Sequence, residues 1–196
     1  MIKSKKELKQ YIEADLKALN CYPLTLKMRV GGRLSPSIFR FQIMMRKLEY
    51  DANVRGKNGI RKAIFWLKYK RYERYGTKLG FTIPINVFGP GLCLCHIGTV
   101  IINREAKVGA NARVHAGVNI GNSALLGENW VPDNVPVIGD HVYIGPGAKL
   151  YGKIKIGDDV AIGANAVVNK DVADHVTVAG VPATIISEKG ATHPCY

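Results

Sequence analysis

The sequence predicts a mostly β protein, a parallel β-helix preceded by an α-helical N-terminal part, and three observations support this. Aliphatic residues recur at every sixth position over the second half of the chain, and a glycine directly follows most of them. Positive charge is concentrated in residues 1–80, which hold 20 Lys and Arg against 6 Asp and Glu, whereas residues 81–196 hold 8 against 9. We therefore expect a basic helical domain (1–80), a β-helix domain (81–188) and a C-terminal tail (189–196).

The overall composition is that of an ordinary globular protein. Of the 196 residues, 47% are hydrophobic and 22% are charged, which excludes disordered and fibrous classes. The four cysteines are too few and too scattered for a disulfide scaffold. The sequence shows neither a signal-peptide pattern nor an apolar run of about 20 residues. We expect a cytoplasmic protein, soluble or membrane-peripheral.

Helices are expected throughout the N-terminal part. Over residues 3–20 the apolar side chains recur at spacings of three and four, and Ser4 is a candidate N-terminal cap. Two further helices are expected, one from Ser37 and one from Gly59 that ends near Gly76.

The last of these helices carries a basic run, residues 68–75, in which tyrosines are interleaved with lysines and arginines. Three interpretations are open: nucleic-acid binding, a solvated helix face, or a patch that meets an anionic glycan, a lipid-linked sugar phosphate or the inner membrane leaflet. No recognised nucleic-acid motif accompanies the run, so we expect no nucleic-acid partner.

The period of six fits a short strand followed by a tight turn, three of which close a triangular coil of 18 residues. Stacked coils about 4.8 Å apart bury the aliphatic residues in a central column, so that five or six coils make a prism about 25 Å tall. Glycine supplies turn conformations that other residues resist. The aliphatic residues in this unbroken frame are Val108, Val114, Ile120, Ile138, Ile144, Leu150, Ile156, Ile162 and Val168.

These repeats, with the strings at residues 162–168 and 178–183, resemble the hexapeptide-repeat acyltransferases. The resemblance covers about residues 81–188. It implies a left-handed coil, a homotrimer, acetyl-CoA as co-substrate in the groove between neighbouring prisms, and no metal. Within the family, residues 88–99 resemble the serine acetyltransferase branch, and more closely its relatives in capsule and lipopolysaccharide clusters.

Transfer of an acetyl group from a thioester to a hydroxyl requires a base, and a neutral imidazole is suited to that role near pH 7. His96 is the candidate catalytic base. It falls in the frame of the aliphatic column, where an ionisable residue is costly unless it belongs to a site. His115 follows 19 residues later, one coil plus one, and is the candidate second base or substrate ligand.

Asn103 and Asn119 are candidate substrate contacts, although asparagine also suits a turn. Trp130 lies in a stretch, residues 122–137, that keeps the six-residue frame but loses the glycines, and we expect a loop that reaches a neighbouring subunit's site. The remaining histidines, His141, His175 and His193, are expected at the surface.

The resemblance implies that acetyl-CoA contacts the later coils through small residues and backbone groups, with a lysine for the nucleotide phosphates. These cofactor-binding candidates are Gly145, Ala164, Lys170, Gly180 and Pro182.

The sequence departs from serine acetyltransferases at positions where that branch keeps charged or imidazole groups: Cys95, Phe81 or a neighbour, and Asn134–Pro136. Thr184 also replaces a Lys or Arg often found there. An amino-acid zwitterion needs counter-charges. We therefore expect an acetyl-CoA-dependent O-acetyltransferase that modifies a saccharide hydroxyl of a capsule, O-antigen or related glycan, with an anionic or lipid-linked acceptor suited to the basic N-terminal part. Serine O-acetyltransferase of cysteine biosynthesis is the alternative.

Two other classes fit less well. Some hexapeptide prisms bind zinc through three histidines, but they need a pair five residues apart, and the candidate histidines here are separated by 19 and 26 residues. Cys93 and Cys95 lack the further partners of a zinc site. A non-catalytic scaffold is disfavoured by the string around His96.

Overall fold

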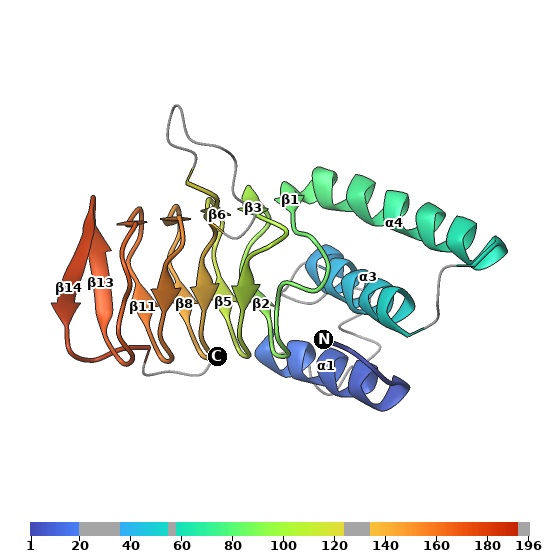
Figure 1. The fold of residues 1–196 in the computed structure, drawn as a ribbon, viewed down its shortest axis with the longest axis horizontal. Coiled ribbons are helices and arrows are strands. Elements are labelled where there is room, and N and C mark those ends of the chain that lie inside the picture. The colour runs from blue at the N-terminus through green and yellow to red at the C-terminus, as the bar shows by residue number, and fades with distance from the viewer. Residues whose placement is uncertain (20–35, 55–57, 124–133, 192–196) are drawn as a thin grey trace.

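A computed structural model describes residues 1–19, 36–54, 58–123 and 134–191 of the chain. Three helices lie at one end of a stack of short strands, and a hairpin closes the opposite end (Figure 1). The helices are α1 (Lys5–Ala18), α3 (Pro36–Asn53) and α4 (Ile60–Leu79). The hairpin consists of β13 (Thr177–Gly180) and β14 (Ala183–Ser187). No described helix is long and apolar enough to cross a membrane.

Three sheets form the sides of the prism. The first contains β1 (Phe81–Thr82), β3 (Val100–Ile102), β6 (Asn119–Gly121), β9 (Lys149–Tyr151) and β12 (Val167–Val168). The second contains β4 (Lys107–Val108), β7 (Val137–Ile138) and β10 (Lys155–Ile156). The third contains β2 (Cys93–Leu94), β5 (Arg113–Val114), β8 (Tyr143–Ile144), β11 (Ala161–Ile162), β13 and β14.

Each strand pairs in parallel with the equivalent strand of the adjacent coil, and β14 alone among the described strands is antiparallel to its partner, β13. The aliphatic residues of the six-residue frame point inward and are at most 4% exposed. Burial of this continuous column stabilises the stack by removing apolar surface from water. The predicted parallel β-helix with an α-helical part before it is confirmed.

The six-residue frame is confirmed for the inward-facing residues from Val108 to Val168, but its extension back to His96 is wrong, and the spacing also changes after β12. Leu94 pairs with Val114 and Ile102 pairs with Ile120, so the first corner contains two more residues than its neighbour. At the other end, Val172 pairs with Ile156 only four residues after the end of β12. Corners face solvent and tolerate insertions and deletions, whereas the strands stay in register with the column.

The helices form where the apolar spacing predicts them. Ser4 caps α1, because its hydroxyl accepts a hydrogen bond from the Glu7 amide at 3.1 Å. The expected end of α4 near Gly76 is wrong, since the helix continues to Leu79. It stops at Gly80, whose φ of 82° is the left-handed conformation typical of a C-terminal cap.

Gly76 has a packing role inside α4 instead. A Cβ atom there would lie 2.8 Å from the Phe81 carbonyl oxygen and 3.1 Å from the Phe41 ring. Glycine therefore lets α4 approach α3 and the first strand closely. The Phe41 and Phe81 rings are 5.1 Å apart, which links the helical part to the prism.

The buried side chains of the helices and the prism form one continuous cluster. Helix gives way to strand between Leu79 and Phe81. The division into separate domains stays a prediction, because the two parts share this core. Trp130, His193 and the residues between 20 and 35 lie outside the described part of the chain.

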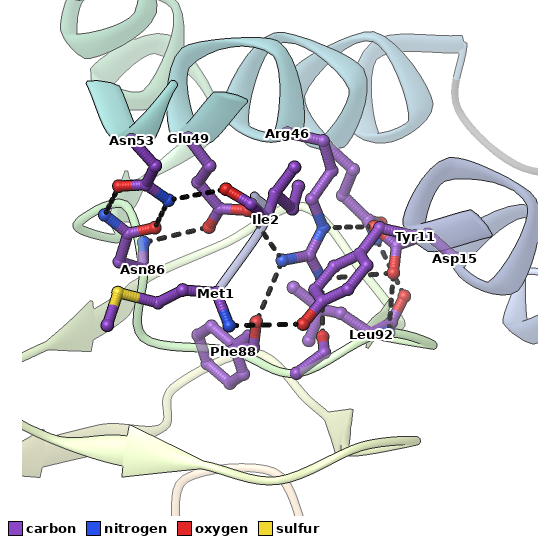
Figure 2. A network of polar contacts seen from close by, with 12 residues as sticks. Met1, Ile2, Tyr11, Asp15, Arg46, Glu49, Asn53, Asn86, Phe88 and Leu92 are labelled. Atoms are coloured by element: carbon purple, nitrogen blue, oxygen red, sulfur yellow. Dashed lines mark hydrogen bonds and ion pairs between the residues drawn. The ribbon is translucent and has the colours of Figure 1, made fainter. Parts of the chain in front are cut away.

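A buried ionic network also joins the two parts (Figure 2). The guanidinium of Arg46, on α3, donates to Asp15 of α1 at 2.8 and 3.1 Å and to Glu49 at 3.0 Å. It also donates to the carbonyl oxygens of Phe88 and Gly89 in the first coil. Burial lowers the pKa of Arg46, but attraction to the two carboxylates outweighs this and the net shift is upward.

Candidate active site

The two candidate histidines lie at one edge of the prism, where the third sheet turns into the first. We call this edge the histidine corner; its described turns are residues 95–99, 115–118, 145–148 and 163–166. The imidazole rings of His96 and His115 have centroids 5.6 Å apart. The Tyr143 ring lies 5.1 Å from His115 on the next coil. Three neighbouring coils thus place a row of two imidazoles and a phenol along the corner.

His96 does not lie in the aliphatic column, contrary to the sequence expectation. Leu94 occupies the inward position of this coil and is 0% exposed, whereas His96 is exposed. The two additional residues of the corner cause the difference, because they carry His96 outward past the end of β2. The correction favours a catalytic role, since an exposed imidazole can reach a substrate.

His115 directly follows β5, and its backbone amide donates to the Ile144 carbonyl oxygen at 3.1 Å. The ring is partly buried, and its Nε2 atom is inaccessible to solvent without a hydrogen-bond partner among the described residues. Burial lowers the pKa of His115, and repulsion from the Arg113 guanidinium lowers it further. His115 is therefore held neutral near pH 7.

Cys95 occupies the same position in its coil as His115 does in the next one, because Leu94 and Val114 are paired. Its Sγ atom lies 3.8 Å from the Sγ atom of Cys93. Phe81, a second departure from the serine acetyltransferase pattern, is 3% exposed and packs in the core. Val135, a third, is also buried. Phe81 and Val135 therefore have packing roles in this chain.

The structure separates the two candidate asparagines. Asn119 lies on β6, just after the histidine corner, and its side chain points toward Gly121. Asn103 lies at the far end of β3, at the next corner of the triangle, where its Oδ1 atom accepts a hydrogen bond from the Glu105 amide at 2.9 Å. The hydrogen bond gives Asn103 a role in this local turn. Because Asn103 lies at a different corner from the histidines, its position does not support the predicted contact with substrate.

The predicted cofactor contacts lie mostly along the histidine corner. Gly145 and the exposed Ala164 lie in its later turns, and Gly180 and Pro182 lie in the β13–β14 hairpin that follows. A Cβ atom at Gly145 would lie 2.7 Å from the Ile162 carbonyl oxygen, so close stacking of the coils already requires this glycine. Lys170 is exposed but follows β12 at the next corner, away from the other four.

Sequence reasoning missed two side chains at this site, Arg113 and Tyr143. Both directly precede an inward-facing aliphatic residue, and they are paired across adjacent coils. Because strand residues alternate between faces, both point outward beside the histidines. The alternation within each repeat was the available signal. Among the described residues, no group of three or more His, Cys, Asp or Glu is placed to hold a metal ion.

Comparisons with known proteins agree with this architecture. Residues 136–170 match the family model of the bacterial transferase hexapeptide with six repeats. A serine acetyltransferase from Mycobacterium tuberculosis is 41% identical over 105 residues, which are 54% of this chain and 44% of that protein. The chain thus matches less than half the length of this curated relative.

Two solved structures share the fold over nearly the whole chain. A serine acetyltransferase from Brucella abortus strain S19, in complex with coenzyme A, is 29% identical with a TM-score of 0.71 and is matched over 96% of this chain and 71% of that chain. A serine acetyltransferase from Neisseria gonorrhoeae, in complex with serine, is 28% identical with a TM-score of 0.62 and is matched over 94% and 71%.

These findings correct the expected substrate class. The curated relatives and the solved structures are named as serine acetyltransferases, so the saccharide acceptor and a place in polysaccharide biosynthesis are wrong, and the alternative fits better. The departures at Phe81 and Val135 misled the sequence interpretation because both residues pack in the interior. In its repeats and its fold, the chain is similar to the hexapeptide-repeat acyltransferases with a left-handed β-helix, and among them to the serine acetyltransferase-like branch.

Proposed function

We propose that this protein is an acetyl-CoA-dependent serine O-acetyltransferase. The observation that carries the proposal is the pair of imidazoles, His96 and His115, 5.6 Å apart at an exposed corner of the prism. The named relatives support serine as the acceptor, and the related structures in complex with coenzyme A or with serine support both substrates.

His96 is the proposed general base. In its neutral form it accepts the proton of the serine hydroxyl while the hydroxyl oxygen attacks the thioester carbonyl of acetyl-CoA. The new C–O bond forms, the C–S bond breaks, and the departing sulfur takes the proton back from the imidazolium. The products are O-acetylserine and the free thiol of CoA. Exposure of His96 allows both substrates to reach the same ring.

His115 is the proposed second residue of the site, acting beside His96. Its lowered pKa keeps the ring neutral, so it adds no second positive charge when His96 takes up the substrate proton. Its buried Nε2 atom can pair with a polar group that enters the corner. Arg113, two residues earlier on the same outward face, supplies a positive charge suited to the serine carboxylate.

The proposed assembly is a homotrimer, with acetyl-CoA in the groove between neighbouring prisms. Gly145, Ala164, Gly180 and Pro182 would contribute small surfaces and backbone groups along the histidine corner. Lys170 would have to reach the nucleotide phosphates from the next corner. Light scattering tests the assembly: a particle with three times the mass of the chain is expected, and a monomer at micromolar concentration would contradict it.

A thiol-release assay tests the activity. With acetyl-CoA present, L-serine should give a steady release of CoA thiol, whereas buffer alone, D-serine and free monosaccharides should not. Mass spectrometry should identify O-acetylserine as the product. Absence of L-serine-dependent thiol release would show that the proposed function is wrong.

His96→Ala tests the assignment of the base. Turnover should fall by about 100- to 10,000-fold, the usual contribution of a positioned general base, while the trimer stays intact. The matched control is His175→Ala, which removes an exposed imidazole from a different corner. Activity of the His96 variant within tenfold of the wild type would exclude His96 as the base.

A further inference from the structure

One side of α4 carries a regular stripe of exposed residues. Its members recur at alternating spacings of four and three residues, so they share one helix face. All six are exposed, and they are Ile60, Ile64, Leu67, Arg71, Arg74 and Lys78. We call this set the α4 stripe.

The α4 stripe changes character along the helix. Its first three members are aliphatic and 80%, 47% and 70% exposed. Trp66, which is 58% exposed, points about 100° around the helix from Leu67, and the Lys70 ammonium lies 4.7 Å from the centre of its ring. Its last three members are cationic. Ordinary solvated helix faces do not expose this much contiguous apolar surface, so the apolar half indicates a partner. The apolar half lies at the end of α4 farthest from the prism (Figure 1).

The cationic half lines a cleft between α3 and α4. The cleft has a volume of about 440 Å³, and its charged lining consists of Arg40, Lys70, Arg71, Arg74 and Lys78. Lys70 forms an ion pair with Glu73 at 3.0 Å. Among the described residues, no acid forms an ion pair with Arg40, Arg71, Arg74 or Lys78 within 4.0 Å. This cleft is therefore suited to an anionic group.

We propose that the α4 stripe docks the protein onto an anionic phospholipid membrane. The aliphatic side chains would enter the boundary between headgroups and acyl chains, and the cations of the cleft would hold lipid phosphates. An interfacial helix lies in the plane of the membrane surface, with the side chains of its apolar face about 5–10 Å deep at the boundary between headgroups and acyl chains. The cations of the α4 stripe share this helix face and would contact the phosphates of the headgroups.

Charge distinguishes this partner from a second copy of the chain. Residues 1–80 hold 20 Lys and Arg against 6 Asp and Glu, so two copies meeting through this face would repel each other. A soluble polyanion would satisfy the cations but would leave the apolar half exposed. An anionic bilayer complements both halves at once.

Vesicle co-sedimentation of the full chain tests the proposal. The protein should bind vesicles of equal parts phosphatidylcholine and phosphatidylglycerol and should remain in solution with phosphatidylcholine alone. Raising the salt to about 1 M shortens the screening length to about 3 Å and should weaken binding. Failure to bind the anionic vesicles, or equal binding to both kinds, would overturn the proposal.

Two variants separate the halves of the stripe. Arg71→Glu/Arg74→Glu should lower the vesicle partition coefficient by about thirtyfold or more, from the loss of two cations near the surface. Ile64→Gln/Leu67→Gln should weaken binding while keeping its salt dependence. The matched control, Lys107→Glu/Lys153→Glu, makes the same charge change at exposed positions on the prism and should bind as the wild type does.

Melting temperature and serine acetylation verify that the variants are folded. Both should stay near wild-type values, because the altered side chains lie outside the histidine corner. If the prism control loses as much vesicle binding as the Arg71/Arg74 variant does, net charge alone would explain the loss. That result would contradict a specific docking surface on α4. Strong binding to heparin without binding to anionic vesicles would identify a soluble polyanion instead and would also contradict the proposal.

Discussion

The helical part and the prism are held together by different kinds of interaction. In the prism, each coil contributes the same few aliphatic residues to one column, and inward-facing residues such as Ile144 and Leu150 are 0% exposed. At the junction between the helices and the first coil, a single buried guanidinium, Arg46, connects three segments that are far apart in the sequence.

This difference between the two regions shows how the first coil of the prism is stabilised. Inside the prism, every strand finds its partner in the adjacent coil, so backbone donors and acceptors are satisfied by repetition. The first coil lacks a preceding coil, and its backbone groups need other partners. Asp15 accepts hydrogen bonds from the amides of Gly91 and Leu92 at 2.9 Å, and Gln42 donates to the Leu92 carbonyl oxygen at 2.7 Å. The helices thus cap the open end of the prism.

The largest stability effect is expected at this cap. Arg46→Ala should lower the free energy of unfolding by about 3–5 kcal/mol, because it leaves the carboxylates of Asp15 and Glu49 buried without their cation. Urea denaturation measures the change. Arg104→Ala, which removes an arginine 80% exposed at its side chain, is the control and should stay within about 0.5 kcal/mol of the wild type. A cost below about 1 kcal/mol for the Arg46 variant would contradict the capping role.

A truncation in the column sharpens the comparison. Ile144→Ala should cost about 2–5 kcal/mol, from lost apolar burial and the cavity that remains. Ile101→Ala, on the same prism but 41% exposed, should cost clearly less. The free energy of unfolding is measured by the same urea titration. Equal costs for the two isoleucines would show that the buried column does not dominate the stability of the prism.

The smallest expected effect concerns pH and the histidine corner. The lowered pKa of His115 means that folding disfavours its protonated form. Stability should therefore fall as the pH drops below the unfolded-state value of about 6.5. His115→Gln should remove this contribution. When the pH falls from about 7.5 to about 5.5, the urea midpoint of the wild type should therefore decrease more than the urea midpoint of the variant. A difference between the two midpoints that does not change with pH would contradict the proposed desolvation of His115.

Sequence and structure also differ in how well they locate the site. The 19-residue separation of His96 and His115 suffices to place them on neighbouring coils, and the structure brings their rings to 5.6 Å. The direction of each ring could not be predicted. A count of six assigns His96 to the column, but the two additional corner residues move it outside, and only the pairing of Leu94 with Val114 reveals them.

The sequence by itself determined the repeat, the three helices and the Ser4 cap of α1, because periodic apolar spacing and local hydrogen bonds act between residues close in the chain. Only the tertiary structure decided the roles of Arg46, Gly76 and Phe81, whose partners lie on other elements. Such contacts depend on which segments fold against each other. The residues next to a charged or small residue in the sequence do not indicate which distant residue it will contact. The same reason explains why substitutions at Phe81 and Val135 resembled a changed substrate site when both residues belong to the packed interior.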